Sequence, residues 1–358
     1  MSTICARCAL RLQRAAQADT RYANGIPTFN EASTPELNDV LASMRNKHFT
    51  PAYLHASERR LIFGTKNKQT LADNPQTVTI GDEEVELQWM DRRKEIPNRT
   101  KLFHKAIDLM AAGEGKDWNN LPNLLAGLKH AGAKAEEKMM GKAVRKAVSA
   151  GRIGAIVQCL QQGEYTGMTL DIDEVLENVI WGLHVTAQRE GWSEEGVLKA
   201  LKAANQVGLL LETEEHGGGR HLREHDPRRR PEVLGAFLEL AAVYAYKFQG
   251  AKDVDGKVKT YADRLLGCID GAAQPLSHAP RPLGPQYEML HGIPIWHGLF
   301  LAEKVLGKGL PQPQLATKVR QDYEAGLTIL AQAIEALEPR GGSYGERAVG
   351  AWRECIRD

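Results

Sequence analysis

Long apolar runs and recognised catalytic motifs are both missing from this chain of 358 residues, and aromatic side chains are scarce. No run of eighteen apolar residues occurs, which excludes a membrane-spanning helix, because such a helix needs about 20 of them. The sequence also has no GxxxxGK[ST] phosphate loop, no GxGxxG fingerprint, no nucleophile elbow and no HExxH pair. We therefore predict no catalytic residues and no cofactor, and we expect the chain not to be an enzyme.

Cysteine is also infrequent, with five residues in the chain. Cys5 and Cys8 form a CxxC, which is half of a zinc site or a redox pair. The other three, Cys159, Cys268 and Cys355, are isolated in stretches that have the pattern of apolar helix faces. No second ligand pair completes a zinc site, so we expect no metal.

Acidic residues are nearly absent from residues 1–22, which carry Arg7, Arg11, Arg14 and Arg21 against Asp19. Apolar residues recur there three or four apart, so a helix would have an apolar face beside a cationic one. This composition is typical of a mitochondrial presequence and predicts a location in the mitochondrial matrix. Since the whole chain has a net charge of +1, the remainder is slightly acidic. Any contact with RNA must therefore come from a local patch.

Two short regions follow the presequence. Residues 23–76 are polar with spaced prolines, and we predict an extended N-terminal segment with at most one short helix near Pro35–Asn46. In residues 77–96, Val78 and Ile80, then Val85 and Leu87, alternate with polar residues around a Gly81-Asp82 turn. This alternation predicts a small β-hairpin near residues 77–90.

Residues 97–212 show helical periodicity in short segments that end at glycines. Such segments favour antiparallel helix pairs and a mainly α fold. Gly132 and Gly167 end two of these units thirty-five residues apart, close to the period of tetratricopeptide and pentatricopeptide repeats. The segment of residues 151–171 resembles the second helix of a pentatricopeptide unit, with Gly167 and Asp171 near the turn glycine and the following aspartate of that motif. We predict an α-helical-repeat array of this type.

The remaining chain divides into a charged loop, residues 213–231, and a C-terminal helical region, residues 232–358. The segment from Val233 to Tyr244 is apolar almost all round, which predicts a helix buried between others.

The charged loop supplies the first candidate site. Its arginines could grip phosphate oxygens, because guanidinium groups bind them two at a time: Arg220, Arg223, Arg228, Arg229 and Arg230. The alternative is a solvated loop neutralised by its own acids. His216, His221 and His225 have a spacing that a metal could use, but the arginines oppose a bound cation.

A second basic group lies on one predicted helix, with spacings that put most of its members on one face: Lys138, Lys142, Arg145 and Lys146. Arg92 and Arg93 form a smaller group. Each could contact RNA, although a charge run is more often a solvated face.

Three blocks carry a family resemblance: IPNRTKLFHKAIDLM (residues 96–110), DWNNLPNLLAGLKHAG (117–132) and DPRRRPEVLGAFLELAA (226–242). Together they resemble a fungal mitochondrial helical-repeat family that is associated with the mitochondrial ribosome or its assembly. The N-terminal ICARCALRLQR is similar to presequences of fungal mitochondrial proteins, many of them ribosomal. The resemblance implies an accessory structural subunit of the fungal mitochondrial ribosome, whose partners are ribosomal proteins and, at its periphery, rRNA.

Two other functions stay open at this point. A pentatricopeptide-like factor that matures or activates a mitochondrial transcript would need several tandem units with paired base-reading positions. An assembly factor for a respiratory complex would use the apolar helices as a groove for a partner and would need no RNA.

Overall fold

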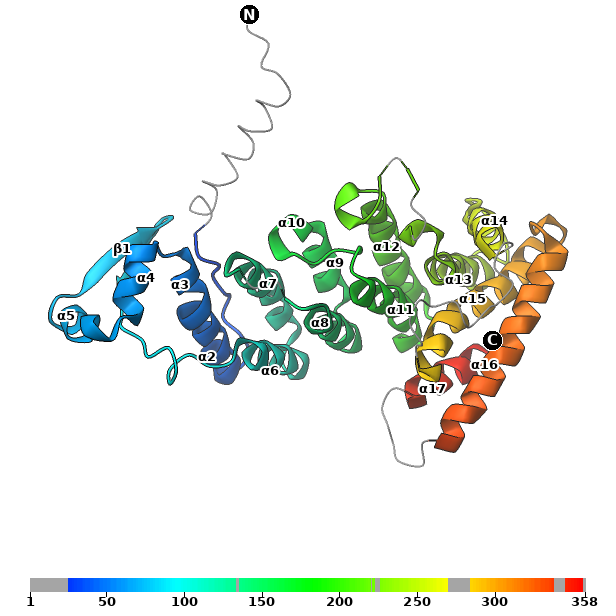
Figure 1. Cartoon of the computed structure of the whole chain (residues 1–358). Helices are drawn as coiled ribbons and strands as arrows, with labels where there is room; N and C mark the ends of the chain where they lie inside the picture. Colours follow the sequence, from blue (N-terminus) through cyan, green and yellow to red (C-terminus); the bar gives the residue numbers. More distant parts are fainter. Residues whose placement is uncertain are drawn as a thin grey trace, which may run out of the picture. The chain divides into compact units, whose positions relative to one another are not determined.

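The computed structural model describes residues 25–132, 135–219, 221–222, 226–269, 284–337 and 345–356. The predicted presequence, residues 1–22, lies outside these ranges. The described chain is mainly α-helical, as predicted, and separates into two compact units at Met168 and Thr169 (Figure 1). Among the described helices, none has the length and apolar content needed to cross a bilayer.

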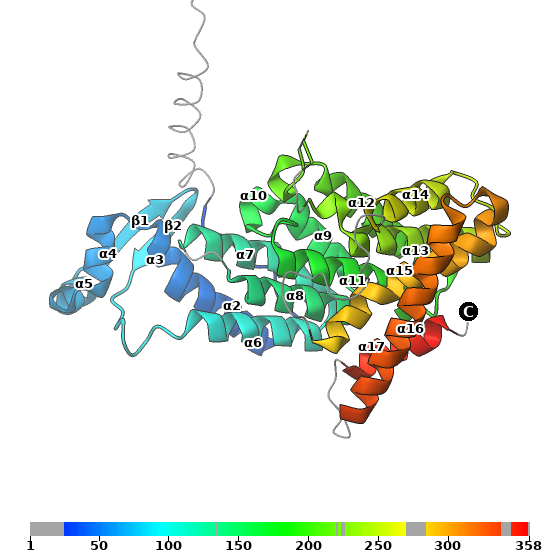
Figure 2. The same cartoon turned by 45° about the vertical axis from the view of Figure 1, so that its right-hand side comes forward.

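The first unit contains short helices, several joined through single turns, together with one two-stranded sheet. Its elements are α2 (Pro35–Met44), the π-helical turn η1 (Arg45–Phe49), α3 (Thr50–Tyr53), α4 (Ala56–Phe63), η2 (Thr65–Asn67), α5 (Lys68–Asp73), β1 (Gln76–Ile80), β2 (Glu83–Leu87), α6 (Arg99–Ala112), η3 (Gly115–Asn120), α7 (Leu121–His130), α8 (Glu137–Ser149), α9 (Ile153–Gln161) and α10 (Gly163–Thr166). Figures 1 and 2 show them in a row, from α4, α5 and the hairpin at one end to α8 and α9 at the other.

The N-terminal segment is more helical than its composition indicates. The short helix predicted near Pro35–Asn46 is confirmed as α2, which Thr34 caps by accepting a hydrogen bond from the Leu37 N–H. The prediction of extended chain beyond it is wrong, because α3, α4 and α5 follow within residues 50–73. These helices are too short to show a clear apolar period, and each contributes one or two buried side chains, such as Ile62 of α4 and Leu71 of α5.

The predicted hairpin is confirmed. β1 and β2 pair antiparallel with Ile80 opposite Glu83, so Gly81 and Asp82 make the turn. Gly81 has a φ of 62°, in the left-handed region that favours glycine. One face carries Ile80 and Leu87, which are buried, and β2 packs against α4. The other face presents Glu84 and Glu86 to solvent.

Packed helix pairs build the rest of the first unit: α2 with α6, α6 with α8, α7 with α9 and α10, and α8 with α9. Asn98 caps α6 by accepting a hydrogen bond from the Lys101 N–H, and Gly113 follows the end of this helix. Asp117 lies fully buried in η3. Its carboxylate accepts hydrogen bonds from Ser33 N–H and Glu114 N–H, and so ties the N-terminal segment to the helices.

In the second unit, several helices pack around one buried helix. Its elements are α11 (Asp173–Arg189), α12 (Glu194–Leu211), η4 (Glu214–His216), η5 (Pro227–Arg229), α13 (Pro231–Phe248), α14 (Lys257–Ile269), α15 (Pro285–Leu306), η6 (Gly307–Gly309), α16 (Pro313–Leu337) and α17 (Gly345–Cys355). The buried helix predicted from Val233 is confirmed as α13, which packs against α11, α12, α14 and α15. Ser193 caps α12 by accepting a hydrogen bond from the Gly196 N–H.

In the second unit, α15 begins at Pro285 and continues through Pro294, a residue type that usually interrupts a helix. The charged loop is only partly a surface loop, because its ends form η4 and η5 and because His216 and Asp226 are buried. The division at Met168 falls inside the predicted helical domain of residues 97–212. The domain boundaries drawn from the sequence therefore stay predictions.

Candidate nucleic-acid contacts and a buried polar centre

The basic group predicted on one helix (Lys138, Lys142, Arg145 and Lys146) lies on α8, and its charge is partly neutralised within the first unit. Lys142 Nζ lies 2.7 Å from Asp108 Oδ2, and Lys146 Nζ lies 3.1 Å from Asp108 Oδ1. Partial burial raises the pKa of Asp108, but hydrogen bonds from both lysines outweigh it and hold that pKa below its usual value. Lys138 is exposed, while Arg145 is half-buried. Two of the four predicted contacts therefore bind a carboxylate of the same unit.

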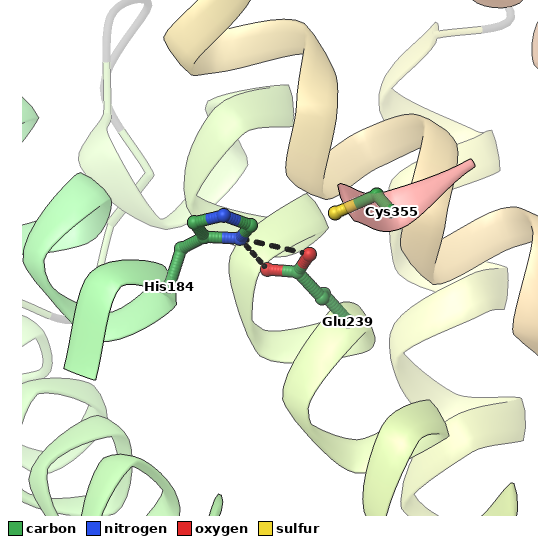
Figure 3. A group of neighbouring side chains, drawn as sticks. All are labelled: His184, Glu239 and Cys355. Atoms are coloured by element: carbon green, nitrogen blue, oxygen red, sulfur yellow. Dashed lines mark hydrogen bonds and ion pairs between the residues drawn. The ribbon is translucent and has the colours of Figure 1, made fainter. Parts of the chain in front are cut away.

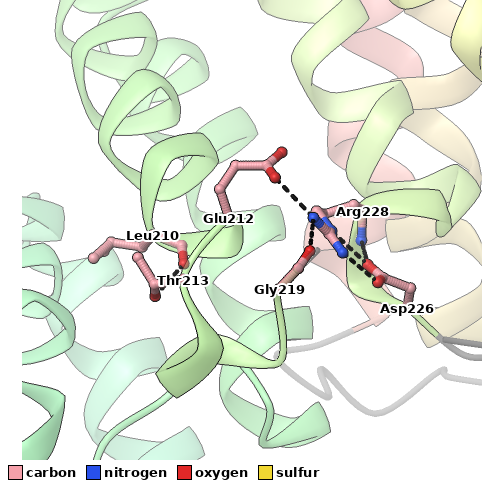
Figure 4. Close-up of polar contacts among 6 residues, drawn as sticks. All are labelled: Leu210, Glu212, Thr213, Gly219, Asp226 and Arg228. Atoms are coloured by element: carbon pink, nitrogen blue, oxygen red, sulfur yellow. Dashed lines mark hydrogen bonds and ion pairs between the residues drawn. The ribbon is translucent and has the colours of Figure 1, made fainter. Parts of the chain in front are cut away.

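Arg228 of the charged loop has its guanidinium surrounded by acceptors (Figure 4). Its Nε and Nη2 lie 2.9 and 2.8 Å from the two oxygens of Asp226, in a bidentate pair. Nη1 donates to Glu212 Oε2 at 2.7 Å and to the Gly219 carbonyl at 3.1 Å. Asp226 is fully buried, so its ion pair with Arg228 is not exposed to solvent. Through its bond to Glu212, Arg228 also holds the loop against the end of α12.

Arg230 is used in the same way at the start of α13. Its guanidinium contacts Asp173 at 2.8 Å and Glu177 at 3.3 Å, both on α11, and also Glu232. Burial lowers the pKa of Arg230, but the three carboxylates outweigh this and raise it. The arginine therefore joins α13 to α11.

The other candidate arginines have different surroundings. Arg220 and Arg223 lie outside the described residues. Arg229 is exposed, as are Arg92 and Arg93, and the Arg92 guanidinium lies over the Phe63 ring, 4.8 Å from its centroid. RNA contact by any of the candidates stays a prediction.

The histidines of the loop do not come together as a metal site in the part of the chain that is described. His216 is fully buried, and its Nδ1 accepts a hydrogen bond from the Leu170 N–H at 3.0 Å. His221 is exposed, and His225 lies outside the described ranges. His216 thus fixes the loop from inside.

The second unit also contains a buried polar centre that the sequence did not reveal. Glu239 of α13, His184 of α11 and His297 of α15 are fully buried. His184 Nδ1 lies 2.9 Å from each carboxylate oxygen of Glu239, as the dashed lines in Figure 3 mark, and His297 Nδ1 lies 2.8 Å from Oε1. One carboxylate therefore connects three helices.

The two imidazoles decide the charge state of this centre. Burial alone raises the pKa of Glu239, but the charge of His184 and hydrogen bonds from both histidines outweigh it and lower the pKa to about 2. Aromatic rings enclose the pair: Trp181 stacks on His184 with centroids 4.5 Å apart, and Trp192 meets both imidazoles edge-on. The glutamate is thus ionised inside an aromatic core.

Cys355 of α17 completes a group that could hold a metal ion. Ligand atoms of His184, Glu239 and Cys355 lie within 4.8 Å of one another, and nitrogen, oxygen and sulfur ligands of this kind suit zinc. Both carboxylate oxygens, however, already have imidazole partners. The centre is also fully buried, so a substrate dissolved in water cannot reach it. We therefore interpret it as a structural link between helices. The available signal was Glu239, a single charged residue within the apolar segment from Val233 to Tyr244.

Comparison with known proteins places the chain in a family. A family model described as mitochondrial ribosomal protein mS27 matches residues 14–354. The small ribosomal subunit protein mS27 of Neurospora crassa is 29% identical over 262 residues, which are 67% of this chain and 64% of that protein. The match thus spans a little under two thirds of the relative's length. Since the family model covers nearly the whole chain, the protein belongs to the mitochondrial ribosomal protein mS27 family.

Proposed function

We propose that the protein is a structural subunit of the small subunit of the mitochondrial ribosome and works in the matrix. The observation that carries this proposal is the match of the mS27 family model from residue 14 to residue 354, across both compact units. The geometry agrees with a structural role, because the buried polar centre and the ion pairs of Arg228 and Arg230 serve to hold helices together.

The packed pairs of the first unit support a finer proposal for the fold. α6 packs with α8, and α7 with α9 and α10, in segments that end at Gly132, Gly151 and Gly167, each with a positive φ. A glycine in the left-handed conformation ends a helix without strain. We therefore propose that α6 to α10 form a degenerate α-helical-repeat array that offers its surfaces to neighbouring ribosomal proteins and, at its edge, to rRNA.

The proposal is tested by sedimentation of the full-length protein, tagged and expressed in mitochondria. After lysis at low salt and dissociation of ribosomes with EDTA, the protein should follow small-subunit rRNA through a sucrose gradient. Treatment of the lysate with nuclease should shift both together. Sedimentation as a free protein at low salt, or with unassembled respiratory subunits regardless of nuclease, would overturn the proposal.

A further inference from the structure

Two exposed basic segments, distant in sequence, meet at the end of the first unit that holds α4 and α5 (Figure 1). The first contributes Arg59 and Arg60 from α4 and Lys68 from α5, and the second is the turn after β2. We call the resulting group the basic corner: Arg59, Arg60, Lys68, Arg92, Arg93 and Lys94. In the sequence, Arg59–Arg60 and Arg92–Lys94 are two separate runs.

Four contacts hold the two segments against each other. The Met90 N–H donates to the Ile62 carbonyl at 2.8 Å, and Trp89 Nε1 donates to the Gly64 carbonyl at 3.0 Å. Lys68 Nζ lies 4.7 Å from the centroid of the Trp89 ring, while Arg92 lies over Phe63. Arg59 and Arg60 are four and three residues before Phe63 in α4, so these two arginines lie on the side of α4 that carries Phe63.

The acids around the basic corner are already engaged. Glu58 accepts from the His55 N–H, Asp73 accepts from Gln69, and Asp91 accepts from the backbone N–H groups of Arg93 and Lys94. Glu95 lies 3.7 Å from Lys47. Among the described residues, no cation of the basic corner forms an ion pair with a carboxylate, in contrast to Lys142, Arg228 and Arg230.

The hairpin separates charge of the opposite sign. Its buried face, with Ile80 and Leu87, is turned toward the helices, since β2 packs on α4. Glu84 and Glu86 are therefore on the outer face, away from α4. A polyanion can approach the basic corner without meeting these glutamates.

We propose that the basic corner binds the phosphate backbone of RNA. Exposed guanidinium and ammonium groups whose local acids are engaged are suited to phosphate oxygens, and the ring beneath Arg92 fixes its plane while leaving its N–H edge available. The proposal rests on the proposed ribosomal function, which makes rRNA the available polyanion. The basic corner is then the surface of the protein that contacts this rRNA.

The test measures binding of the full-length protein to a short RNA duplex and to an oligouridylate over a range of salt concentrations. R59Q/R60Q/R93Q/K94Q removes four cations and keeps the two that lie on aromatic rings, so the local packing is preserved. Loss of about four phosphate contacts should reduce the slope of log K against log salt by about 3, so that each twofold fall in salt concentration widens the ratio of the variant's Kd to that of the wild type roughly eightfold. K199Q/K202Q/K252Q/K259Q, which removes four exposed lysines of the second unit, makes the same change in net charge.

The outcomes separate this proposal from the proposed function. Weaker RNA binding by the first variant alone supports the basic corner, whereas equal effects of both variants, or no effect, overturn it. Equal affinity of the basic corner for polyglutamate would also overturn it and indicate an acidic protein segment as the partner. Sedimentation of each variant with the small subunit is recorded in parallel. A protein that sediments with the subunit but binds RNA independently of the basic corner refutes only this inference.

Discussion

Glu239 has an unusual environment for a glutamate, because its side chain is fully buried. A carboxylate in an apolar core is unstable unless it is ionised with partners or protonated, and here two imidazoles from different helices supply the partners. Because the bonds connect α11, α13 and α15, the same contact that solvates the charge also fixes the packing of three helices.

Replacement of Glu239 by Gln should therefore destabilise the second unit. The variant keeps the volume but leaves both imidazoles without an anionic acceptor, and breaking a buried pair costs about 3–5 kcal/mol. Urea unfolding followed by tryptophan fluorescence measures this, since Trp181 and Trp192 lie against the histidines. E335Q, at an exposed ion pair with Arg353, is the control and should change the unfolding free energy by less than about 0.5 kcal/mol. Equal effects of the two variants would contradict this role of Glu239.

The same residue predicts an acid-sensitive step. The folded pKa of Glu239 is lowered to about 2 from an ordinary value of 4.5, so the unfolded chain binds this proton more readily than the folded chain. The stabilisation is complete above about pH 4.5 and is lost as the pH falls toward 2. Acid titration of the fluorescence of the wild type and of E239Q measures the difference. The variant should show a shallower loss of stability between these pH values, and identical slopes would contradict the prediction.

At the scale of elements, close packing of α7 on η1 depends on a glycine. A Cβ at Gly127 would collide with the ring of Phe49, which is fully buried. G127A should destabilise the first unit by about 1–3 kcal/mol through overpacking. At Gly154 of α9, an added Cβ meets no atom within 4 Å. G154A should therefore stabilise by up to about 1 kcal/mol, and thermal unfolding of both variants checks the opposite signs.

The loop before α13 gives a further test at this scale. R228Q removes the bidentate partner of the buried Asp226 and should cost about 3 kcal/mol of unfolding free energy. The adjacent Arg229 is exposed, and R229Q should change stability by less than about 0.5 kcal/mol. Thermal melts of the two variants distinguish them. Similar melting temperatures would mean that the Arg228 pair does not hold the loop.

Much of the secondary structure could be predicted because its signals are local. Asn98 and Ser193 cap helices, and Gly81 and Asp82 make a two-residue turn. The alternation or the helical period of apolar residues indicates the other elements. α3 to α5 were missed because helices of four to eight residues carry too little periodicity. The extent of α15 is difficult to predict because Pro294 lies inside the helix, where proline is normally unfavourable and tertiary packing overrides that preference.

The polar contacts could not be predicted for a different reason. Glu212 lies 16 residues from Arg228, and Asp173 lies 57 from Arg230. His184 and His297 are 55 and 58 residues from Glu239. No local pattern encodes which acid meets which base over such separations. An arginine run in the sequence therefore gave candidates for phosphate binding, two of which the fold uses as internal ion pairs.

For the whole molecule, the division of cations into paired and unpaired side chains matters more than the net charge. The chain is nearly neutral, and many of its cations are paired inside their own unit, so general attraction to RNA is weak. Because the basic corner carries unpaired cations, raising the salt concentration should weaken its contact with RNA. Contacts with neighbouring proteins through helix faces should persist. Washing small subunits with increasing salt should therefore release the protein late, and release together with loosely held basic proteins would contradict this view.

Quantitative mass spectrometry of small subunits, purified through a sucrose gradient after EDTA dissociation, tests most directly our proposal that this member of the mS27 family is a structural component of the small mitochondrial ribosomal subunit. The protein should be present in equimolar amount with the other small-subunit proteins and should be depleted from the large subunit. A clearly substoichiometric amount, or equal recovery from free-protein fractions, would contradict the claim.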